Sequence, residues 1–222
     1  MNIIAKIKTD FPTKFGIPRQ SGIIEELKGK IIFEPKYRNA DFIRGLEDFS
    51  HIWLLWEFST GENFTPTVRP PKLGGNTKVG VFASRSPFRP NPIGLSCVRL
   101  EKIELSENLG PILHIAGADL MDGTAIFDIK PYIPYSDCHA DATAGFSKDA
   151  SSMLLRVCIP ESLLSLIPEE KRSALHRVLE LDPRPAYQDD ESRVYGFGFA
   201  GFEIRFTVSS GTLTVCEIFK TE

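Results

Sequence analysis

Residues 95–129 read LSCVRLEKIELSENLGPILHIAGADLMDGTAIFDI, and this stretch decides the fold. It contains three apolar segments, Leu95–Leu105, Ile112–Ala116 and Ala125–Ile129, separated by turns that contain Gly, Asn or Asp. Short segments of this kind, with turn residues at regular intervals, are typical of strands in an all-β domain. The pattern therefore predicts a β-barrel or a β-sandwich.

The same pattern extends toward the N-terminus. His51–Phe58 carries two tryptophans among other strand formers, which predicts a buried strand. The sequence further predicts a strand at residues 2–8, a hairpin of Ile23–Leu27 and Lys30–Phe33 turning at Lys28 and Gly29, a short helix over Ala40–Leu46 capped by Asn39, and a strand at Val79–Ala83.

The pattern changes after about residue 135. Residues 168–181 place apolar side chains at helical spacing behind a first turn that contains acidic residues, which predicts a helix. Phe202–Val208 alternates apolar and polar residues, and Thr212–Phe219 follows across a Ser-Ser-Gly turn, which predicts two strands. With Ser136–Ser152 as the linker, we expect a β-rich domain at residues 1–140 and a small α+β domain at residues 150–222.

Composition is that of a globular protein, with 222 residues, 42% hydrophobic and 25% charged side chains, and a formal net charge of −3. No apolar run approaches the roughly 18 residues that span a bilayer, and the N-terminus lacks the regions of a signal peptide. We therefore expect a cytoplasmic protein without membrane contact. The four cysteines lack the paired spacing of a zinc site, so no metal is expected.

Gly196–Gly201 matches the pattern G-x-G-x-x-G of dinucleotide-binding loops. Such a loop needs a strand before it and a helix after it, whereas here an alternating strand pattern follows. The motif therefore predicts a glycine-rich hairpin turn.

Residues 80–94, GVFASRSPFRPNPIG, place Arg85, Arg89 and Asn91 beside three prolines. Because proline fixes φ and removes a backbone donor, these polar side chains sit on a stiff loop. Preorganised charge favours a binding site, although a rigid surface loop with solvated arginines explains the same residues equally well.

Seven short motifs in order along the chain resemble the TsaA/TrmO family. They are IPRQSG at 17–22, GLEDFSHIW at 45–53, RPP at 69–71, the loop at 80–94, DLMDGT at 119–124, DIKPY at 128–132 and DPRPAY at 182–187. The resemblance implies an S-adenosylmethionine-dependent tRNA methyltransferase with a β-barrel catalytic domain, assembled as a homodimer. The implied acceptor is N6 of N6-threonylcarbamoyladenosine at position 37, in the anticodon loop.

The resemblance also implies which residues bind S-adenosylmethionine. They are Pro18, Arg19 and Gln20; Ser59 and Thr60; Arg85 and Leu95; and Asp122, Gly123, Thr124 and Ala125. Relatives often have a histidine where this chain has Ser59 and Thr60, so this pair departs from the family pattern.

A tRNA substrate requires cations that follow the phosphates and rings that stack on bases. This requirement predicts substrate contacts from Arg69, Arg89, Arg184 and Tyr187. Lys72 and Lys78 lie with Arg69 and Arg89 in or beside the long loops. The segment that holds Arg184 and Tyr187 is explained equally well as the stop of the preceding helix.

The sequence does not name the group that accepts the proton from N6. His51 fits a base and a packed histidine equally well. Two other function classes remain open: a non-catalytic module that binds S-adenosylmethionine or adenosine, and a metal-dependent hydrolase that uses Asp119, Asp122 and Asp128.

Overall fold

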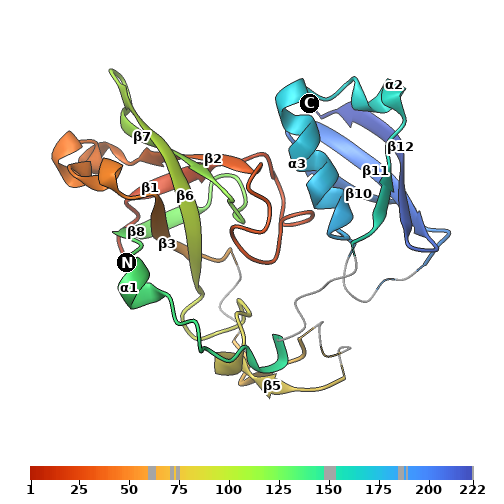
Figure 1. The fold of residues 1–222 in the computed structure, drawn as a ribbon, viewed down its shortest axis with the longest axis horizontal. Helices are drawn as coiled ribbons and strands as arrows, with labels where there is room; N and C mark the ends of the chain where they lie inside the picture. The colour runs from red at the N-terminus through yellow and green to blue at the C-terminus, as the bar shows by residue number, and fades with distance from the viewer. Residues whose placement is uncertain are drawn as a thin grey trace.

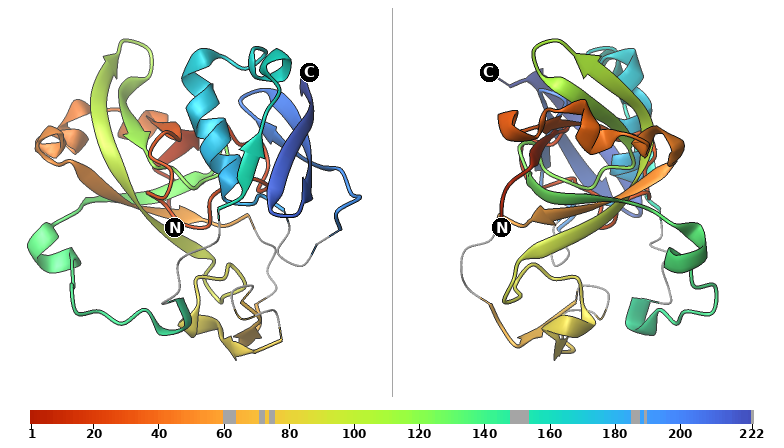
Figure 2. Two further views of the ribbon diagram at one scale, coloured as in Figure 1. Left: turned by 45° about the vertical axis from the view of Figure 1, so that its right-hand side comes forward. Right: turned by 90° about the vertical axis from the view of Figure 1, so that its left-hand side faces the viewer.

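The computed structural model describes residues 1–59, 64–70, 73, 76–147, 154–184, 188 and 190–221. Two bodies of secondary structure lie side by side (Figure 1, Figure 2). The first is a closed barrel, and the second is a four-stranded sheet with a helix packed on it. The segment at residues 76–92, yellow in both figures, lies below the barrel in these views.

Six antiparallel strands form the barrel, in the order β1-β2-β7-β6-β3-β8. Strand β8 pairs with β3 on one side and with β1 on the other, so this sheet closes on itself without a free edge. The bounds are Ala5–Lys8 for β1, Lys28–Phe33 for β2, His51–Glu57 for β3, Ile93–Ser106 for β6, Gly110–Ala116 for β7 and Ala125–Pro131 for β8. The predicted mainly β fold is confirmed, and it is a barrel and not a sandwich.

Buried and exposed side chains alternate along the strands, and the buried ones form the core of the barrel. In β3, Ile52, Leu54 and Trp56 are buried while their neighbours are at least partly exposed. Ile7 of β1 and Leu113 of β7 are fully buried in the same cluster. Removal of these apolar side chains from water stabilises the barrel, so the predicted buried strand at residues 51–58 is confirmed to within one residue.

The predicted hairpin at residues 23–33 is wrong. Lys28 and Gly29 do not form a turn, because they begin β2 and pair with strand β7. Ile24 and Leu27 are buried three residues apart, which is not the two-residue period of a strand. Both side chains pack into the core of the second body.

The predicted short helix after Asn39 exists but is shorter. The Asn39 side chain accepts a hydrogen bond from the Asp41 N–H at 3.0 Å, so the predicted cap is confirmed. The element is a 3-10 helix, η2 (Ala40–Ile43), and a second one, η3 (Leu46–Asp48), follows it. Gly45 separates the two with a φ of 83°, a conformation that glycine adopts without strain.

Between β3 and β6, strands β4 (Thr67–Val68) and β5 (Val79–Gly80) form a separate two-stranded sheet. The predicted strand at Val79–Ala83 is wrong beyond Gly80, because Val81–Ala83 form the 3-10 helix η5. The Ser84 hydroxyl donates to the Val81 carbonyl at 2.8 Å and closes this turn.

The second body is a sheet in the order β10-β11-β12-β9, with β9 parallel to β12. Helix α3 packs on it and buries Ala174, Leu175, Val178 and Leu179, which follow helical spacing (Figure 1). The predicted helix and the two predicted strands are confirmed. The bounds are Arg156–Cys158 for β9, Glu161–Leu164 for α2, Glu169–Glu180 for α3, Tyr195–Phe199 for β10, Phe202–Ser209 for β11 and Thr212–Lys220 for β12.

The glycine-rich motif lies in a β-hairpin. Gly196 and Gly198 are part of β10, and only Ala200 and Gly201 form the turn, with φ values of 51° and 81°. Strand β11 follows directly, so the helix that a dinucleotide-binding loop requires is not in that place. The predicted turn is therefore correct in type but shorter than the motif.

Three further short elements lie in the described part of the chain: η1 (Pro35–Tyr37), α1 (Pro134–Asp137) and η6 (Gly145–Ser147). The last two overlap the predicted linker at residues 136–152, of which 148–152 lie outside the described residues. Within the described ranges, no helix is long and apolar enough to cross a membrane.

The loop between β1 and β2 ties the two bodies together. Phe11 belongs to the core of the second body and meets Phe199 edge to face, at 5.4 Å between ring centroids. Beside it, Asp10 forms a 2.6 Å ion pair with Lys171 of α3, and the Asp10 carbonyl accepts from the Ala200 N–H. The division at residues 140 and 150 stays a prediction, and this N-terminal loop contributes to the second core.

Replacement of Phe11 by alanine should lower the free energy of unfolding by about 3 to 5 kcal/mol, because it leaves a cavity in the second core. Urea denaturation followed by circular dichroism measures this loss. Phe15→Ala is the control, since that ring is half exposed in the same loop and should cost about 0.5 kcal/mol or less. Equal effects of the two variants would contradict the packing role of Phe11.

Candidate functional site

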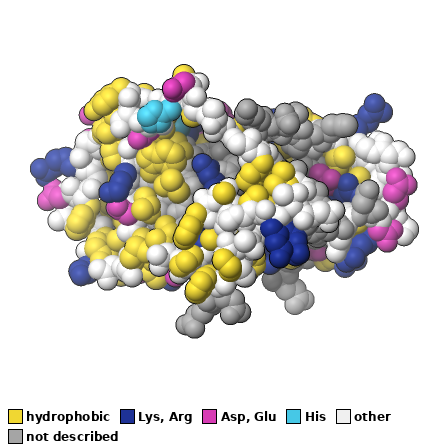
Figure 3. Space-filling view, turned by 90° about the horizontal axis from the view of Figure 1, so that it is seen from below, with side chains coloured by type: hydrophobic (Ala, Val, Ile, Leu, Met, Phe, Trp, Pro, Cys, Tyr) yellow, Lys and Arg dark blue, Asp and Glu magenta, His cyan; other side chains and the backbone are white. Residues whose placement is uncertain are grey.

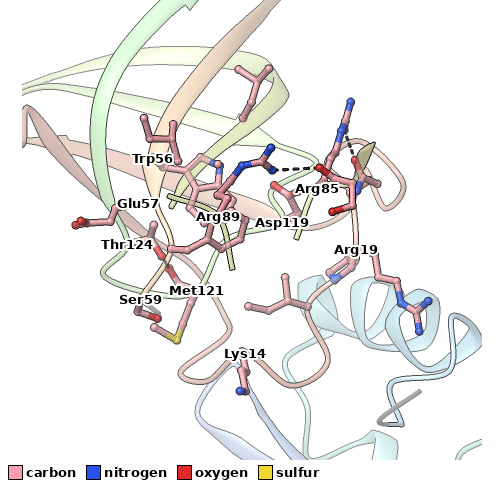
Figure 4. Close-up of a pocket in the computed structure, with 18 of the residues that line it drawn as sticks. Lys14, Arg19, Trp56, Glu57, Ser59, Arg85, Arg89, Asp119, Met121 and Thr124 are labelled. Carbon is pink, nitrogen blue, oxygen red and sulfur yellow. Dashed lines mark hydrogen bonds between the residues drawn. The ribbon is translucent and has the colours of Figure 1, made fainter. Parts of the chain in front are cut away.

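A cavity of about 650 Å³ opens where β3 ends and β6 begins. Four segments far apart in the sequence line it: the loop before β2, the end of β3, the proline-rich loop into β6, and the turn before β8 (Figure 4). Its volume is typical of small-molecule sites. The lining residues are Lys14, Ile17, Pro18, Arg19, Gln20, Trp56, Glu57, Phe58, Ser59, Ser84, Arg85, Arg89, Asn91, Ile93, Gly94, Leu95, Asp119, Met121 and Thr124.

The apolar wall of the cavity depends on a close approach between β3 and β6. Trp56 pairs with Gly94 across the ladder, and a Cβ on Gly94 would lie 2.2 Å from the indole ring. Glycine is therefore required for the ring to take this place. Phe58 packs on Trp56 at 4.3 Å between ring centroids and extends the wall.

The proline-rich loop holds its two arginines through specific hydrogen bonds. Arg85 donates to the side-chain oxygen of Gln20, which joins this loop to the loop before β2. Arg89 donates to the Ser84 carbonyl at 3.1 Å, within its own loop. Both interactions are drawn in Figure 4, and both guanidinium groups line the cavity. The alternative of solvated surface arginines is therefore the weaker one.

Asp119 is the shielded carboxylate of the cavity. Its Oδ1 accepts a 2.6 Å hydrogen bond from the hydroxyl of Ser96, which is fully buried and accepts in turn from Trp56 Nε1 at 2.9 Å. Burial raises the pKa of Asp119 to about 6, although the Ser96 hydrogen bond and the charge of Arg85 oppose the shift.

The charges around the cavity favour a ligand with an anionic group. Lys14, Arg19, Arg85 and Arg89 line it, against the carboxylates of only two described residues, Glu57 and Asp119. Cations beside an apolar aromatic wall suit a ligand that combines a carboxylate or phosphate with a flat ring.

The cavity gathers many of the predicted cofactor-binding residues. Those that line it are Pro18, Arg19, Gln20, Ser59, Arg85, Leu95 and Thr124. Gly123 and Ala125 are not among the lining residues, and Thr60 lies outside the described residues. The assignment of all eleven residues to cofactor binding stays a prediction.

Asp122 has other partners. Its carboxylate accepts from Lys8 Nζ at 3.1 Å and from the Thr9 N–H at 3.0 Å. It lines a second, smaller cavity of about 280 Å³, together with Lys171 of α3. Met121 and Thr124, on either side of it, line the large cavity.

The predicted tRNA contacts are dispersed. Arg89 lines the cavity, whereas Arg69 does not and follows β4. Arg184 forms a two-point ion pair with Asp182, at 2.8 Å from both Nε and Nη2, so this guanidinium already has a carboxylate partner. Tyr187 and Lys72 lie outside the described residues.

His51 and the acidic residues have different partners. His51 contacts the Ser50 hydroxyl at 2.9 Å, meets the Tyr132 ring, and does not line the cavity. Asp128 forms an ion pair with Lys130 at 2.9 Å, away from the partners of Asp119 and Asp122. The described part of the chain contains no group of three or more His, Cys, Asp or Glu placed to hold a metal ion.

Sequence reasoning missed the part of the site built from core positions. Trp56, Phe58 and Met121 resemble ordinary apolar residues in the sequence, and nothing local marks them as lining a cavity. Asp119 did carry a signal, because it lies between the buried residues Ala118 and Leu120. A charged residue in such a run is rarely buried without a purpose.

The free energy of unfolding should depend on the ionisation of Asp119. Its pKa is about 6 in the folded chain and near 4 in an unfolded one, so the folded state binds more protons between these values. This contribution is therefore most favourable below about pH 4, and it is lost as the pH rises through 6, by up to about 3 kcal/mol. The Asp119→Asn variant should lack this loss.

Urea denaturation of the wild type and of Asp119→Asn at pH 4 to 7 measures the difference. Asp128→Asn is the matched control, since its half-exposed carboxylate pairs with Lys130. If the free energy of unfolding of the wild type and of Asp119→Asn changed with pH in the same way, the raised pKa of Asp119 would be contradicted.

Two family models match the chain: the tRNA-methyltransferase O N-terminal domain at residues 6–138 and the TrmO C-terminal domain at residues 154–221. The chain is 39% identical over 225 residues to the tRNA (adenine(37)-N6)-methyltransferase of Escherichia coli strain K12, covering 96% of this chain and 94% of the relative. It is 42% identical over 176 residues to the enzyme of the same name from Eikenella corrodens, covering 78% and 99%. A crystal structure of TrmO from Pseudomonas aeruginosa matches with a TM-score of 0.80 and 30% identity, over 98% of this chain and 96% of that one. The chain therefore belongs to the tRNA-methyltransferase O family.

Proposed function

We propose that this protein transfers a methyl group from S-adenosylmethionine to N6 of N6-threonylcarbamoyladenosine at position 37 of tRNA. The observation that carries the proposal is the cavity at the end of the barrel, which lies inside the segment that matches the family's N-terminal domain. The relatives from Escherichia coli and Eikenella corrodens carry names that state the same position and the same atom.

The cavity fits S-adenosylmethionine by its size and its groups. This donor presents a carboxylate, an amino group, a sulfonium, two ribose hydroxyls and an adenine, and when bound it supplies an electrophilic methyl group. Arg19 and Arg85 suit the carboxylate, Glu57 and Ser59 offer acceptors, and Trp56 offers an apolar face. A relative from Pyrococcus abyssi, 35% identical over 64% of this chain, is named a probable S-adenosyl-L-methionine-binding protein, which supports this choice of ligand.

The residues around the cavity contribute mainly by orientation. Methyl transfer from a sulfonium is an in-line displacement, so the protein has to align the acceptor nitrogen and exclude water. The hydrogen bond between Arg85 and Gln20 restrains two of the lining loops before any ligand arrives. This preorganisation reduces the cost of ordering the site when ligands bind.

The segment before β6 offers a surface for RNA. Residues 64–92 contain five Lys and Arg and no Asp or Glu, in a chain whose net charge is −3. Phe64, Phe82 and Phe88 are exposed by 62%, 79% and 49%. The face seen from below shows hydrophobic side chains with Lys and Arg among them (Figure 3). Exposed rings and cations suit the bases and phosphates of a single-stranded loop.

A non-catalytic module that binds S-adenosylmethionine remains the alternative. It shares the cavity but predicts binding without transfer. From the family resemblance we further propose that the protein is a cytoplasmic homodimer and that Arg69, Arg89, Arg184 and Tyr187 contact the tRNA.

Incubation of the purified protein with S-adenosylmethionine and tRNA from a strain that lacks the enzyme should add one methyl group to threonylcarbamoyladenosine. Nucleoside mass spectrometry measures this gain, and tRNA without the threonylcarbamoyl group is the control that should stay unmethylated. If S-adenosylmethionine binds but well-modified tRNA gains no methyl group, the non-catalytic module is the better account.

The Phe82→Ala variant should raise the KM for tRNA about tenfold and leave the affinity for S-adenosylmethionine unchanged, because a lost stacking ring costs about 1 to 3 kcal/mol. Steady-state kinetics and calorimetry measure the two effects. Phe42→Ala is the matched control, since that ring is 64% exposed on η2 and is not a lining residue of the cavity. An unchanged KM for Phe82→Ala would remove this surface from the proposal.

A further inference from the structure

The hydrogen bonds behind the cavity wall run in one direction. An indole N–H can only donate, so Trp56 Nε1 occupies a lone pair of the Ser96 hydroxyl. The single proton of that hydroxyl then points to Asp119 Oδ1, at 2.6 Å. Oδ1 is therefore held as an acceptor for Ser96, and backbone N–H groups of Ser21 and Asp119 also bond to this carboxylate.

The surroundings of these hydrogen bonds keep their direction fixed. Ser96 is fully buried and Trp56 is 8% exposed, so water does not compete for their hydrogen bonds. Asp119 itself lines the cavity, and in Figure 4 it lies between Trp56 and Arg85. Arg85 acts on Asp119 through its charge but donates its own hydrogen bond to Gln20.

We propose that Asp119 is the catalytic base, which accepts the N6 proton of the acceptor nucleoside; this role rests on the proposed function. In the step, N6 forms a bond to the methyl carbon, and the S–C bond of the donor breaks with both electrons going to sulfur. The N6–H bond breaks as its proton moves to Asp119. Atoms and charge balance without a further reactant, because the cationic sulfonium becomes a neutral thioether and the carboxylate becomes a neutral acid.

Asp119 is better suited to this task than the other carboxylate on the cavity wall. Glu57 is exposed at the end of β3, where water solvates its charge. Burial makes Asp119 a stronger base than a surface carboxylate, yet its pKa of about 6 leaves it ionised near neutral pH. The other charged groups that line the cavity are Lys14, Arg19, Arg85 and Arg89, and of these the Arg85 cation favours the ionised form of Asp119.

The first test replaces Asp119 by asparagine, which keeps an acceptor for Ser96 and removes the base. At pH 8 the kcat should fall at least 100-fold, while the Kd for S-adenosylmethionine and the KM for tRNA stay within about threefold. The wild-type kcat should decline below about pH 6, and the residual activity of the variant should lack this decline. Asp128→Asn, outside the cavity, should keep the wild-type kcat and pH profile.

The second test measures the same hydrogen-bonded group of Trp56, Ser96 and Asp119 without catalysis. Trp53→Phe leaves Trp56 as the only tryptophan, so its fluorescence should titrate with a midpoint near pH 6 as Asp119 ionises. Asp119→Asn in this background should abolish the titration. Ser96→Ala should move the midpoint to higher pH, because the lost hydrogen bond favoured the ionised carboxylate.

The outcomes separate this role from the proposed function. A wild-type protein that leaves modified tRNA unmethylated overturns both. If the wild type methylates the tRNA and the kcat of Asp119→Asn is within tenfold of the wild-type kcat, only the assignment of Asp119 as the catalytic base is overturned. A more than tenfold weaker Kd for S-adenosylmethionine in Asp119→Asn likewise overturns it, because Asp119 would then hold the donor.

Discussion

The pairing of β8 with both β1 and β3 is the constraint on which the rest of this structure depends. It closes the sheet, so the six strands share one core and their connecting loops gather at the ends of the barrel. The register of β3 against β6 then sets Trp56 opposite Gly94. From that contact follow the aromatic wall of the cavity and the position of the Trp56 indole N–H.

The loop between β1 and β2 links this barrel to the C-terminal sheet. One part of it, at Asp10 and Phe11, belongs to the second body through an ion pair and a core contact. Another part, at Arg19 and Gln20, lines the cavity. A single segment therefore has residues in the core of the second body and in the wall of the cavity.

The site combines fixed cations with one shielded carboxylate. The arginines line the cavity from two loops, and Asp119 lies on a wall whose hydrogen bonds come from buried residues. This separation suits a reaction in which anionic groups must be held while a proton leaves a nitrogen atom. The cations and the carboxylate suit different parts of the ligands, and the two are coupled because the charge of Arg85 lowers the pKa of Asp119.

Local patterning by itself determined the strand at β3, the buried stripe of α3 and the cap at Asn39. The resemblance in sequence also indicated the family and many lining residues, including Arg19 and Arg85. The hairpin at residues 23–33 failed because Ile24 and Leu27 are buried by the C-terminal body and not by neighbours in sequence. Only the tertiary structure joined Trp56, Ser96 and Asp119, since contacts across a closed barrel depend on strand order and register, which local periodicity does not encode.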